Sequence, residues 1–217
     1  LESSGFKSNN IIVDITNYVM LETGQPLHAY DLSKIDSKIK VRRGYNNEKI
    51  TLLDETVKKV NKTFLLITDN SKALGIAGIM GGQHSGISAD TENIVLESAC
   101  FNHKTIMGRS RMLNLHTESG LRFERGVDPL IQKHAIERAT QLINEYSDGQ
   151  NGPISIKQDD ESIPLKQPIM LRKKRIHQIL GITIANYKVH EILTKLDMQV
   201  AEQEYGYSGW LVTPPSF

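Results

Sequence analysis

From residue 39 onward the sequence alternates between short apolar runs and turn-forming residues. The runs lie at residues 39–43, 49–54, 63–69 and 73–80, and Gly, Asn or Asp flanks each of them. Runs of this length, bounded by such residues, are typical of short β-strands joined by turns. A further apolar run at residues 93–101 adds another strand candidate. We therefore expect this part of the chain to form a sheet of short strands.

Helical spacing is found on both sides of these runs. Residues 10–21 are crowded with apolar side chains and are followed by Gly24 and Pro26, which end helices. Residues 129–146 place apolar side chains at helical intervals, and residues 103–113 also have helical character. Helices that flank a group of short strands predict the α+β class, with mixed α/β layers and a central β-sheet.

A change of composition divides the chain. Residues 147–165 are rich in turn-forming and charged residues, which indicates a domain boundary. Beyond a linker at 157–167, residues 168–217 contain two short helix candidates and a hairpin candidate, a pattern that resembles a winged-helix domain. We expect a large domain at 1–156 and a small winged-helix-like domain at 168–217, truncated at its C-terminus. The sequence does not begin with Met, so we expect a piece of a larger polypeptide.

The composition is that of an ordinary globular protein, with 39% hydrophobic and 24% charged residues. The net charge of +1 implies that neighbouring domains would supply much of any affinity for RNA. No apolar run approaches the ~18 residues of a membrane span, and the N-terminus does not have the pattern of a signal peptide. A single cysteine fits a cytoplasmic protein. Cys100 follows an apolar run, so we expect a buried structural thiol.

Several common chemistries leave no signature in the sequence. There is no P-loop, no GxGxxG after a strand, no GxSxG, no HExxH and no CxxC. His28 follows the Gly24–Pro26 break and can be a base, a metal ligand or a polar anchor in a loop. His28 and Asp31 could begin a metal site, but a third ligand is missing. We therefore expect this chain to use neither a metal nor a cofactor.

Four separated stretches together resemble one family. They read "DITNYVMLETGQPLHAYDL", "GIAGIMGGQHSGI", "NIVLESACF" and "HTESGLRFERGVDP". This order resembles the beta subunit of bacterial phenylalanine–tRNA ligase, a class II aminoacyl-tRNA synthetase. Residues 7–156 resemble its tRNA-editing domain, and residues 168–217 resemble most of the winged-helix-like domain that follows.

The resemblance implies a proofreading function. The family's editing domain hydrolyses the ester of tyrosine mischarged on phenylalanine tRNA. The whole synthetase is a heterotetramer of two alpha and two beta subunits and uses ATP and Mg²⁺. A fragment without the alpha subunit should not make aminoacyl-adenylate. Two alternatives remain open, namely a non-catalytic tRNA-binding module and a purely architectural domain of the same synthetase.

The resemblance also implies a set of site residues. Glu97 would accept a hydrogen bond from the tyrosine hydroxyl, although the residue types alone favour a structural role in which Glu97 caps or pairs at a strand end. Hydrolysis needs a positioned water, a proton acceptor and donors for the oxyanion. His28 would be the base or would orient the water, and a ribose hydroxyl of the tRNA is the alternative base. The remaining residues would place water, bind the carbonyl or leave room for the amino acid: Thr16, Asn17, Thr117 and Gly81.

Two positions depart from the family pattern. Relatives often have arginine where this chain has Lys7, which keeps the positive charge for the tRNA terminus but not the bidentate geometry. Relatives often have alanine where this chain has Ser119, which could narrow the pocket or add a hydrogen bond. Both changes bear on substrate selectivity and leave the reaction class as it is.

Overall fold

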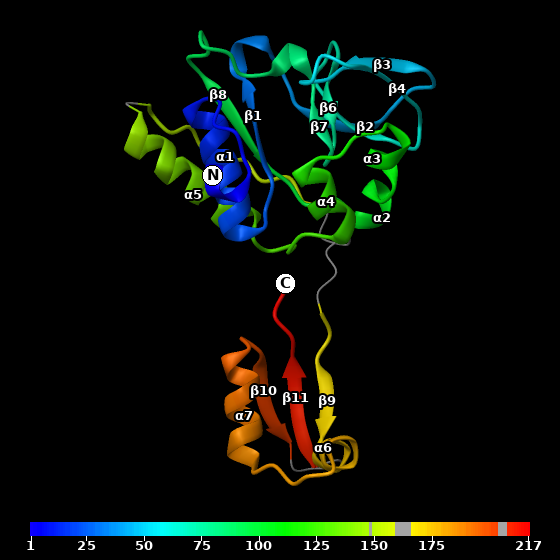
Figure 1. Cartoon of the computed structure of the whole chain (residues 1–217), viewed down its shortest axis with the longest axis vertical. Helices are drawn as coiled ribbons and strands as arrows, with labels where there is room; N and C mark the ends of the chain where they lie inside the picture. The colour runs from blue at the N-terminus through cyan, green and yellow to red at the C-terminus, as the bar shows by residue number, and fades with distance from the viewer. Residues whose placement is uncertain (148, 159–165, 204–207) are drawn as a thin grey trace. The chain divides into compact units, whose positions relative to one another are not determined.

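Two units, Leu1–Gln158 and Asp159–Phe217, make up the computed structural model (Figure 1). It describes residues 1–147, 149–158, 166–203 and 208–217. Helices and antiparallel sheets occur in both units, so the α+β class is confirmed. The strands of the first unit are distributed over three small sheets. Within the described residues, no helix is both long and apolar enough to cross a membrane.

Helix α1 (Ile11–Thr23) covers one side of the first unit together with helix α5 (Gln132–Tyr146). Asn10 caps α1 by accepting a hydrogen bond from the Val13 amide, and Gly24 ends it in the left-handed conformation. The two helices pack through small and branched side chains, and both contact the strand pair described next. The predictions of helices at 10–21 and 129–146 are confirmed, with shifts of a few residues at the ends.

Strands β1 (Leu27–Asp31) and β8 (Ile94–Ser98) form an antiparallel pair beside these helices (Figure 1). The sequence analysis proposed no element for residues 27–31, so this strand was not predicted. Gln25 is fully buried, and its Nε2 donates to the carbonyl of Ala99, which fixes the start of β1 beside the end of β8. The strand forms through this tertiary pairing, which local propensity does not reveal.

The two faces of the β1–β8 pair have different neighbours because side chains alternate along a strand. Leu27 and Leu96 face α1 and α5. Tyr30 and Val95 face the other way, where they pack against the strands of a second sheet, including Ile67. The β1–β8 pair thus lies between the helices and this second sheet.

The second sheet has four strands in the order β2-β5-β6-β7. Its strands are β2 (Lys40–Arg43), β5 (Leu65–Thr68), β6 (Ala73–Ile76) and β7 (Met80–Gly81), and a separate hairpin consists of β3 (Glu48–Thr51) and β4 (Val57–Val60). The strand expected at 73–80 is interrupted by a turn at Gly78, whose φ is +68°. A Cβ at Gly78 would approach the Phe123 ring to 3.2 Å, so the turn also needs glycine for space.

Three short helices follow β8 in the sequence. Helices α2 (His103–Ile106) and α3 (Arg109–Met112) replace the single helix expected at 103–113, because Gly108 adopts a left-handed conformation between them. Helix α4 (Glu118–Arg125) occupies the charged stretch for which the sequence interpretation proposed no element. Phe123 of this helix is buried among apolar side chains of the second sheet and the β3–β4 hairpin, including Leu66 and Ile50. Three short 3-10 turns, η1 (Glu2–Ser4), η2 (Leu32–Lys34) and η3 (Gln83–Ser85), complete the unit.

Cys100 lies on the surface, which corrects the expectation of a buried thiol. It follows the last residues of β8, and the core is filled instead by neighbouring Phe101, which packs against Phe123 with ring centroids 5.1 Å apart.

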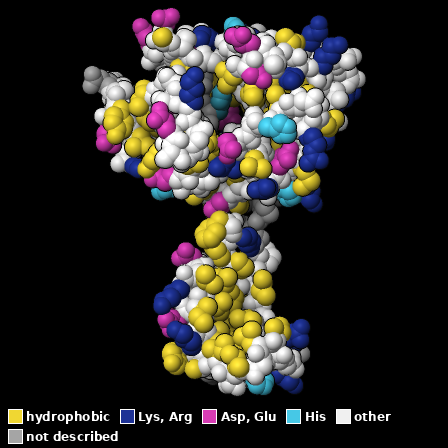
Figure 2. All heavy atoms as spheres, viewed as in Figure 1, with side chains coloured by type: hydrophobic (Ala, Val, Ile, Leu, Met, Phe, Trp, Pro, Cys, Tyr) yellow, Lys and Arg dark blue, Asp and Glu magenta, His cyan; other side chains and the backbone are white. Residues whose placement is uncertain are grey.

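The second unit contains β9 (Ile169–Arg172), α6 (Lys173–Leu180), α7 (Asn186–Lys195), β10 (Gln199–Gln203) and β11 (Gly209–Thr213). Its sheet has the order β10-β11-β9 around a small core with buried Trp210. The expected helices and hairpin strands are present, while residues 159–165 of the linker and 204–207 of the hairpin lie outside the described residues. Hydrophobic side chains gather on the face of this unit seen in Figure 2, and Ile169 is 60% exposed.

Candidate functional site

The strand register brings the central residues of the site together. His28 of β1 is directly opposite Glu97 of β8 in the antiparallel pair. Tyr30 is two residues beyond His28 and is therefore on the same face, diagonal to Glu97. Thus one imidazole, one carboxylate and one phenol share the face that points away from α1 and α5.

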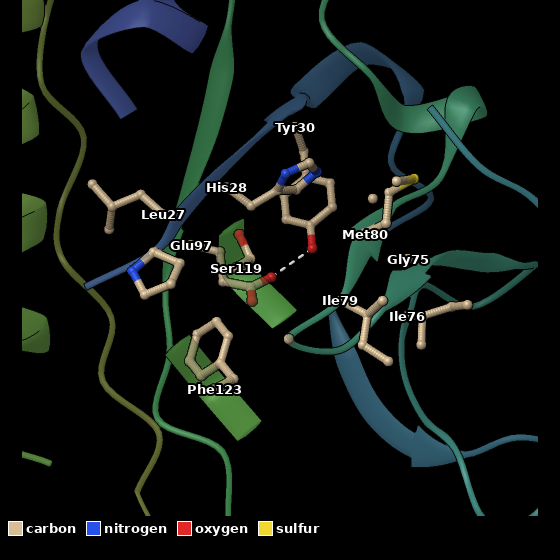
Figure 3. A pocket seen from close by; sticks show the side chains of 13 residues that line it. Leu27, His28, Tyr30, Gly75, Ile76, Ile79, Met80, Glu97, Ser119 and Phe123 are labelled. Carbon is tan, nitrogen blue, oxygen red and sulfur yellow. Dashed lines mark hydrogen bonds between the residues drawn. The ribbon is translucent and has the colours of Figure 1, made fainter. Parts of the chain in front are cut away.

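A cavity lies between this face, the β6–β7 turn and helix α4 (Figure 3). It has a volume of about 50 Å³, enough for a few water molecules. Most of its wall is apolar or backbone, and the polar side chains are few. The wall is formed by Pro26, Leu27, His28, Tyr30, Gly75, Ile76, Gly78, Ile79, Met80, Gly81, Glu97, Ser119 and Phe123.

The carboxylate of Glu97 is engaged by a residue of the protein itself. The hydroxyl of Tyr30 donates a hydrogen bond to Oε2 of Glu97 over 2.5 Å (Figure 3). Burial raises the pKa of Glu97, and the hydrogen bond from Tyr30 opposes this by favouring the carboxylate. Burial, together with the neighbouring Glu97 charge, raises the pKa of Tyr30 well above its usual value, so Tyr30 remains a donor at neutral pH. Glu97 is therefore a partly buried acceptor with one oxygen already occupied.

His28 has the opposite character, because its ring nitrogen lacks a partner. Its Nε2 is buried and forms no hydrogen bond with any described residue. Burial lowers the pKa of His28 to about 4, so the ring is neutral at physiological pH. Its ring contacts that of Tyr30 edge-on, with centroids 4.4 Å apart. An unpaired buried nitrogen is costly, and a ligand or water in the cavity could pair with it.

Gly81 of β7 supplies the space for this imidazole. A Cβ at position 81 would lie 2.5 Å from Nε2 of His28 and 3.2 Å from a methyl group of Leu53. Contacts this short force one side to move. Gly81 therefore fixes where the His28 ring can lie, in addition to lining the cavity.

Helix α4 contributes Ser119 and Phe123 to the cavity, and Thr117 fixes the start of this helix. The Thr117 hydroxyl accepts from the Gly120 amide and donates to the carbonyl of Ile79, both at 2.9 Å. The same side chain thus joins α4 to the β6–β7 turn, but it is not part of the wall of the cavity.

Three other residues from the sequence-predicted set lie outside the wall of this cavity. Thr16 is on α1, and its hydroxyl donates to the carbonyl of Val13 at 2.8 Å. Asn17 is partly buried on the same helix, and Lys7 is exposed before it. The structure brings His28, Gly81, Glu97 and Ser119 together and leaves Thr16, Asn17, Thr117 and Lys7 apart from the cavity.

The idea of a metal site at His28 and Asp31 finds no further ligand. Asp31 accepts hydrogen bonds from Ser33 and Thr91 and lies 3.2 Å from the ammonium of Lys34. Its odd spacing from His28 directs it to the other face of β1. No group of three potential metal ligands occurs among the residues that the structure describes.

Tyr30 is the site residue that sequence reasoning missed. The available signal was the period-two spacing of His28 and Tyr30 in "LHAYD", which places both on one face of a strand. That signal is useful only once residues 27–31 are known to be a strand. Ile79, in the turn after β6, and Met80, at the start of β7, could not have been located without the cavity itself.

The fold and this cavity between strand pair, turn and helix define a known class of domain. The chain belongs to the B3/4 domain family, whose model matches residues 1–148.

Its relatives are named more specifically. The phenylalanine–tRNA ligase beta subunit of Nitrosococcus oceani is 48% identical over 217 residues, and that of Methylococcus capsulatus is 44% identical. Each alignment covers 100% of this chain and 27% of the relative, so the chain spans about a quarter of their length. These relatives confirm the resemblance that the four sequence motifs indicated.

One solved structure is also similar. It is an N-terminal fragment of the phenylalanyl-tRNA synthetase beta subunit from Pyrococcus horikoshii, with 13% identity and a TM-score of 0.44. The match covers 95% of this chain and 60% of that fragment.

Proposed function

We propose that this chain is the proofreading part of a phenylalanine–tRNA ligase and hydrolyses the ester of tyrosine mischarged on phenylalanine tRNA. The observation that carries the proposal is the pairing of Glu97 with His28 across β1 and β8, inside a mostly apolar cavity. The two relatives named above are beta subunits of phenylalanine–tRNA ligase, which supports a role for this chain in the same ligase.

Such a site is needed because the apolar pocket that binds phenylalanine discriminates only weakly against tyrosine. An apolar pocket made for phenylalanine rejects an added hydroxyl only by about 10²-fold. A second site can instead select for tyrosine by placing a hydrogen-bond acceptor at the position of its hydroxyl. Glu97 fits this role because a bound tyrosine donates to its carboxylate, whereas phenylalanine leaves part of a buried charge without a partner.

The reacting end of the substrate would lie near His28. Its neutral ring and unpartnered Nε2 can orient the attacking water or the ester. A pKa of about 4 makes His28 a weak base, so the orienting role is favoured over proton abstraction. A neighbouring ribose hydroxyl of the tRNA would relay the proton, because it accepts one from the attacking water while it gives its own to the departing ester oxygen. Ser119 would narrow the cavity beside Glu97 or donate to the substrate.

Thr16, Asn17, Thr117 and Lys7 would act at a distance from the amino-acid cavity. Thr117 supports the wall by holding α4 to the β6–β7 turn. Lys7 and Asn17 would contact the tRNA end outside the cavity, whereas buried Thr16 would support helix α1 through its bond to the Val13 carbonyl. In the proposed assembly the alpha subunit, ATP and Mg²⁺ serve the synthetic reaction of a cytoplasmic heterotetramer. Hydrolysis here uses water alone.

A deacylation assay tests the proposal. The intact protein should deacylate tyrosyl-tRNA(Phe) faster than phenylalanyl-tRNA(Phe). Glu97→Ala should remove most of this preference, while Glu137→Gln on the exposed surface of α5 should leave it unchanged. A wild-type protein that deacylates neither ester would instead support the non-catalytic tRNA-binding or architectural alternative.

A further inference from the structure

The hydroxyl of Tyr30 already occupies the carboxylate that is proposed to recognise a tyrosine side chain. It donates to Oε2 of Glu97, and no other described residue donates a hydrogen bond to that side chain. Tyr30 is only 2% exposed and is held by packing against Ile67, Leu74 and Ala77. The phenol is therefore fixed in place before any ligand binds.

We infer that Tyr30 is a positioning residue that determines selectivity, because its hydroxyl holds Oε2 of Glu97 and leaves Oε1 to accept the hydrogen bond of a ligand's phenol. The inference rests on the proposed function and extends it from Glu97 to a second residue. The ligand class is a para-hydroxylated aromatic amino acid bound as an ester.

The shape of the strand pair supports this division of the two oxygens. Tyr30 and Glu97 are diagonal neighbours on one face, so the phenol reaches the carboxylate from the β1 side. Both residues also line the cavity (Figure 3). A carboxylate offers two oxygens and about four acceptor directions, so one internal and one bound phenol can be accepted together.

The charge of Glu97 gives the contact its effect on selectivity. Burial alone favours the neutral acid, and the Tyr30 hydrogen bond favours the carboxylate. When phenylalanine is bound, burying a neutral carboxylic acid beside its ring costs much less free energy than burying a carboxylate with only one of its oxygens paired. Because Tyr30 orients Glu97 and its hydrogen bond favours the carboxylate form, phenylalanine is unfavourable in the cavity.

Tyr30→Phe removes the donor and keeps the ring. In the intact protein, we expect the ratio of kcat/KM for tyrosyl-tRNA(Phe) over phenylalanyl-tRNA(Phe) to fall about tenfold, the scale of one hydrogen bond to a charged group. Glu97→Gln should lower the ratio as well, and Tyr30→Phe combined with Glu97→Gln should lower it no further, because Tyr30 acts through the charge of Glu97. A purely structural defect would instead add to the effect of Glu97→Gln.

A matched control is available on α1. Tyr18 also donates to a glutamate, Glu22, but at 3.4 Å on the exposed surface. Tyr18→Phe should leave the selectivity ratio unchanged. An unchanged or increased ratio in Tyr30→Phe would overturn the inference while leaving the proposed function intact. A wild-type ratio near one would overturn the proposed function and the inference with it.

A second measurement needs no variant of Tyr30. The Tyr30 hydroxyl is buried and donates to Glu97, so its proton should exchange slowly with water and give an NMR signal in the wild-type protein. With tyrosinamide bound, this signal should persist, because the ligand pairs with Oε1. Loss of the signal on binding would show that the ligand displaces Tyr30, and the inference would then be wrong.

Discussion

Gly81 and His28 approach so closely that a Cβ at position 81 would lie 2.5 Å from Nε2 of the imidazole. Gly81→Ala should therefore push the His28 ring out of its position. Overpacking of this kind costs about 1–3 kcal/mol, and we also expect at least a tenfold loss of deacylation of tyrosyl-tRNA(Phe). Thermal unfolding and single-turnover deacylation measure the two effects.

The control for this variant is Gly152→Ala, since a Cβ there would meet nothing within 4 Å. It should change neither stability nor activity. Full activity in Gly81→Ala would mean that the position of the His28 ring is unimportant for hydrolysis.

The buried imidazole makes stability depend on pH. The pKa of His28 is about 4 in the folded protein and has an ordinary value of 6.5. Between these values the unfolded chain binds a proton that the folded chain excludes, so acidification lowers the free energy of unfolding. From pH 7 to pH 5 the contribution of His28 should fall by about 2 kcal/mol. Urea unfolding should show a smaller pH dependence in His28→Gln, and equal dependence in both proteins would contradict the burial of a neutral ring.

Thr117 should matter more for the wall of the cavity than for the chemistry. Thr117→Ala removes the cap of α4 and the bond to the Ile79 carbonyl, which should cost about 1–2 kcal/mol of unfolding free energy. Thr117→Ser keeps the hydroxyl and should recover most of that loss. Denaturant unfolding of the two variants decides between this capping role and a direct contact of the Thr117 methyl group.

Glu97 should be a site where function reduces stability. Burial raises its pKa, so keeping it ionised at high pH costs free energy that a neutral glutamine would not. Glu97→Gln keeps an acceptor for Tyr30 and should raise the free energy of unfolding at pH 8 by about 1 kcal/mol. The difference should shrink as pH falls through the raised pKa of Glu97, where the wild-type carboxyl becomes neutral. A variant less stable than the wild type at pH 8 would contradict this assignment.

Local patterns predicted the helices at 10–21 and 129–146 because each carries a helical apolar face and a clear terminus, such as Gly24. Most of the short strands were also predicted, since turn residues bound them. Strand β4 was not predicted, because its sequence has two lysines between two valines and no apolar run. The break at Gly108 was missed, because a single glycine inside a segment of helical character can either end the helix or be tolerated within it.

Strand β1 and helix α4 could not be predicted from local sequence patterns, and the candidate site depends on both. Residues 27–31 form a strand only because β8, 67 residues away at the Tyr30–Glu97 contact, pairs with them. Gln25 assists this pairing through a buried hydrogen bond that no spacing rule reveals. The motifs therefore identified Glu97 and His28 as candidates, whereas Tyr30 required the register.

The register of β1 against β8 has a consequence for how such a protein can change over generations. Lengthening or shortening the connecting turns leaves the acid opposite the imidazole, because the pairing of the strands is untouched. Adding or deleting one residue within either strand would turn His28 or Glu97 toward the helices, so the two side chains would no longer share one face. Sequence variants of this domain should therefore vary in length between the strands and keep a constant count inside them.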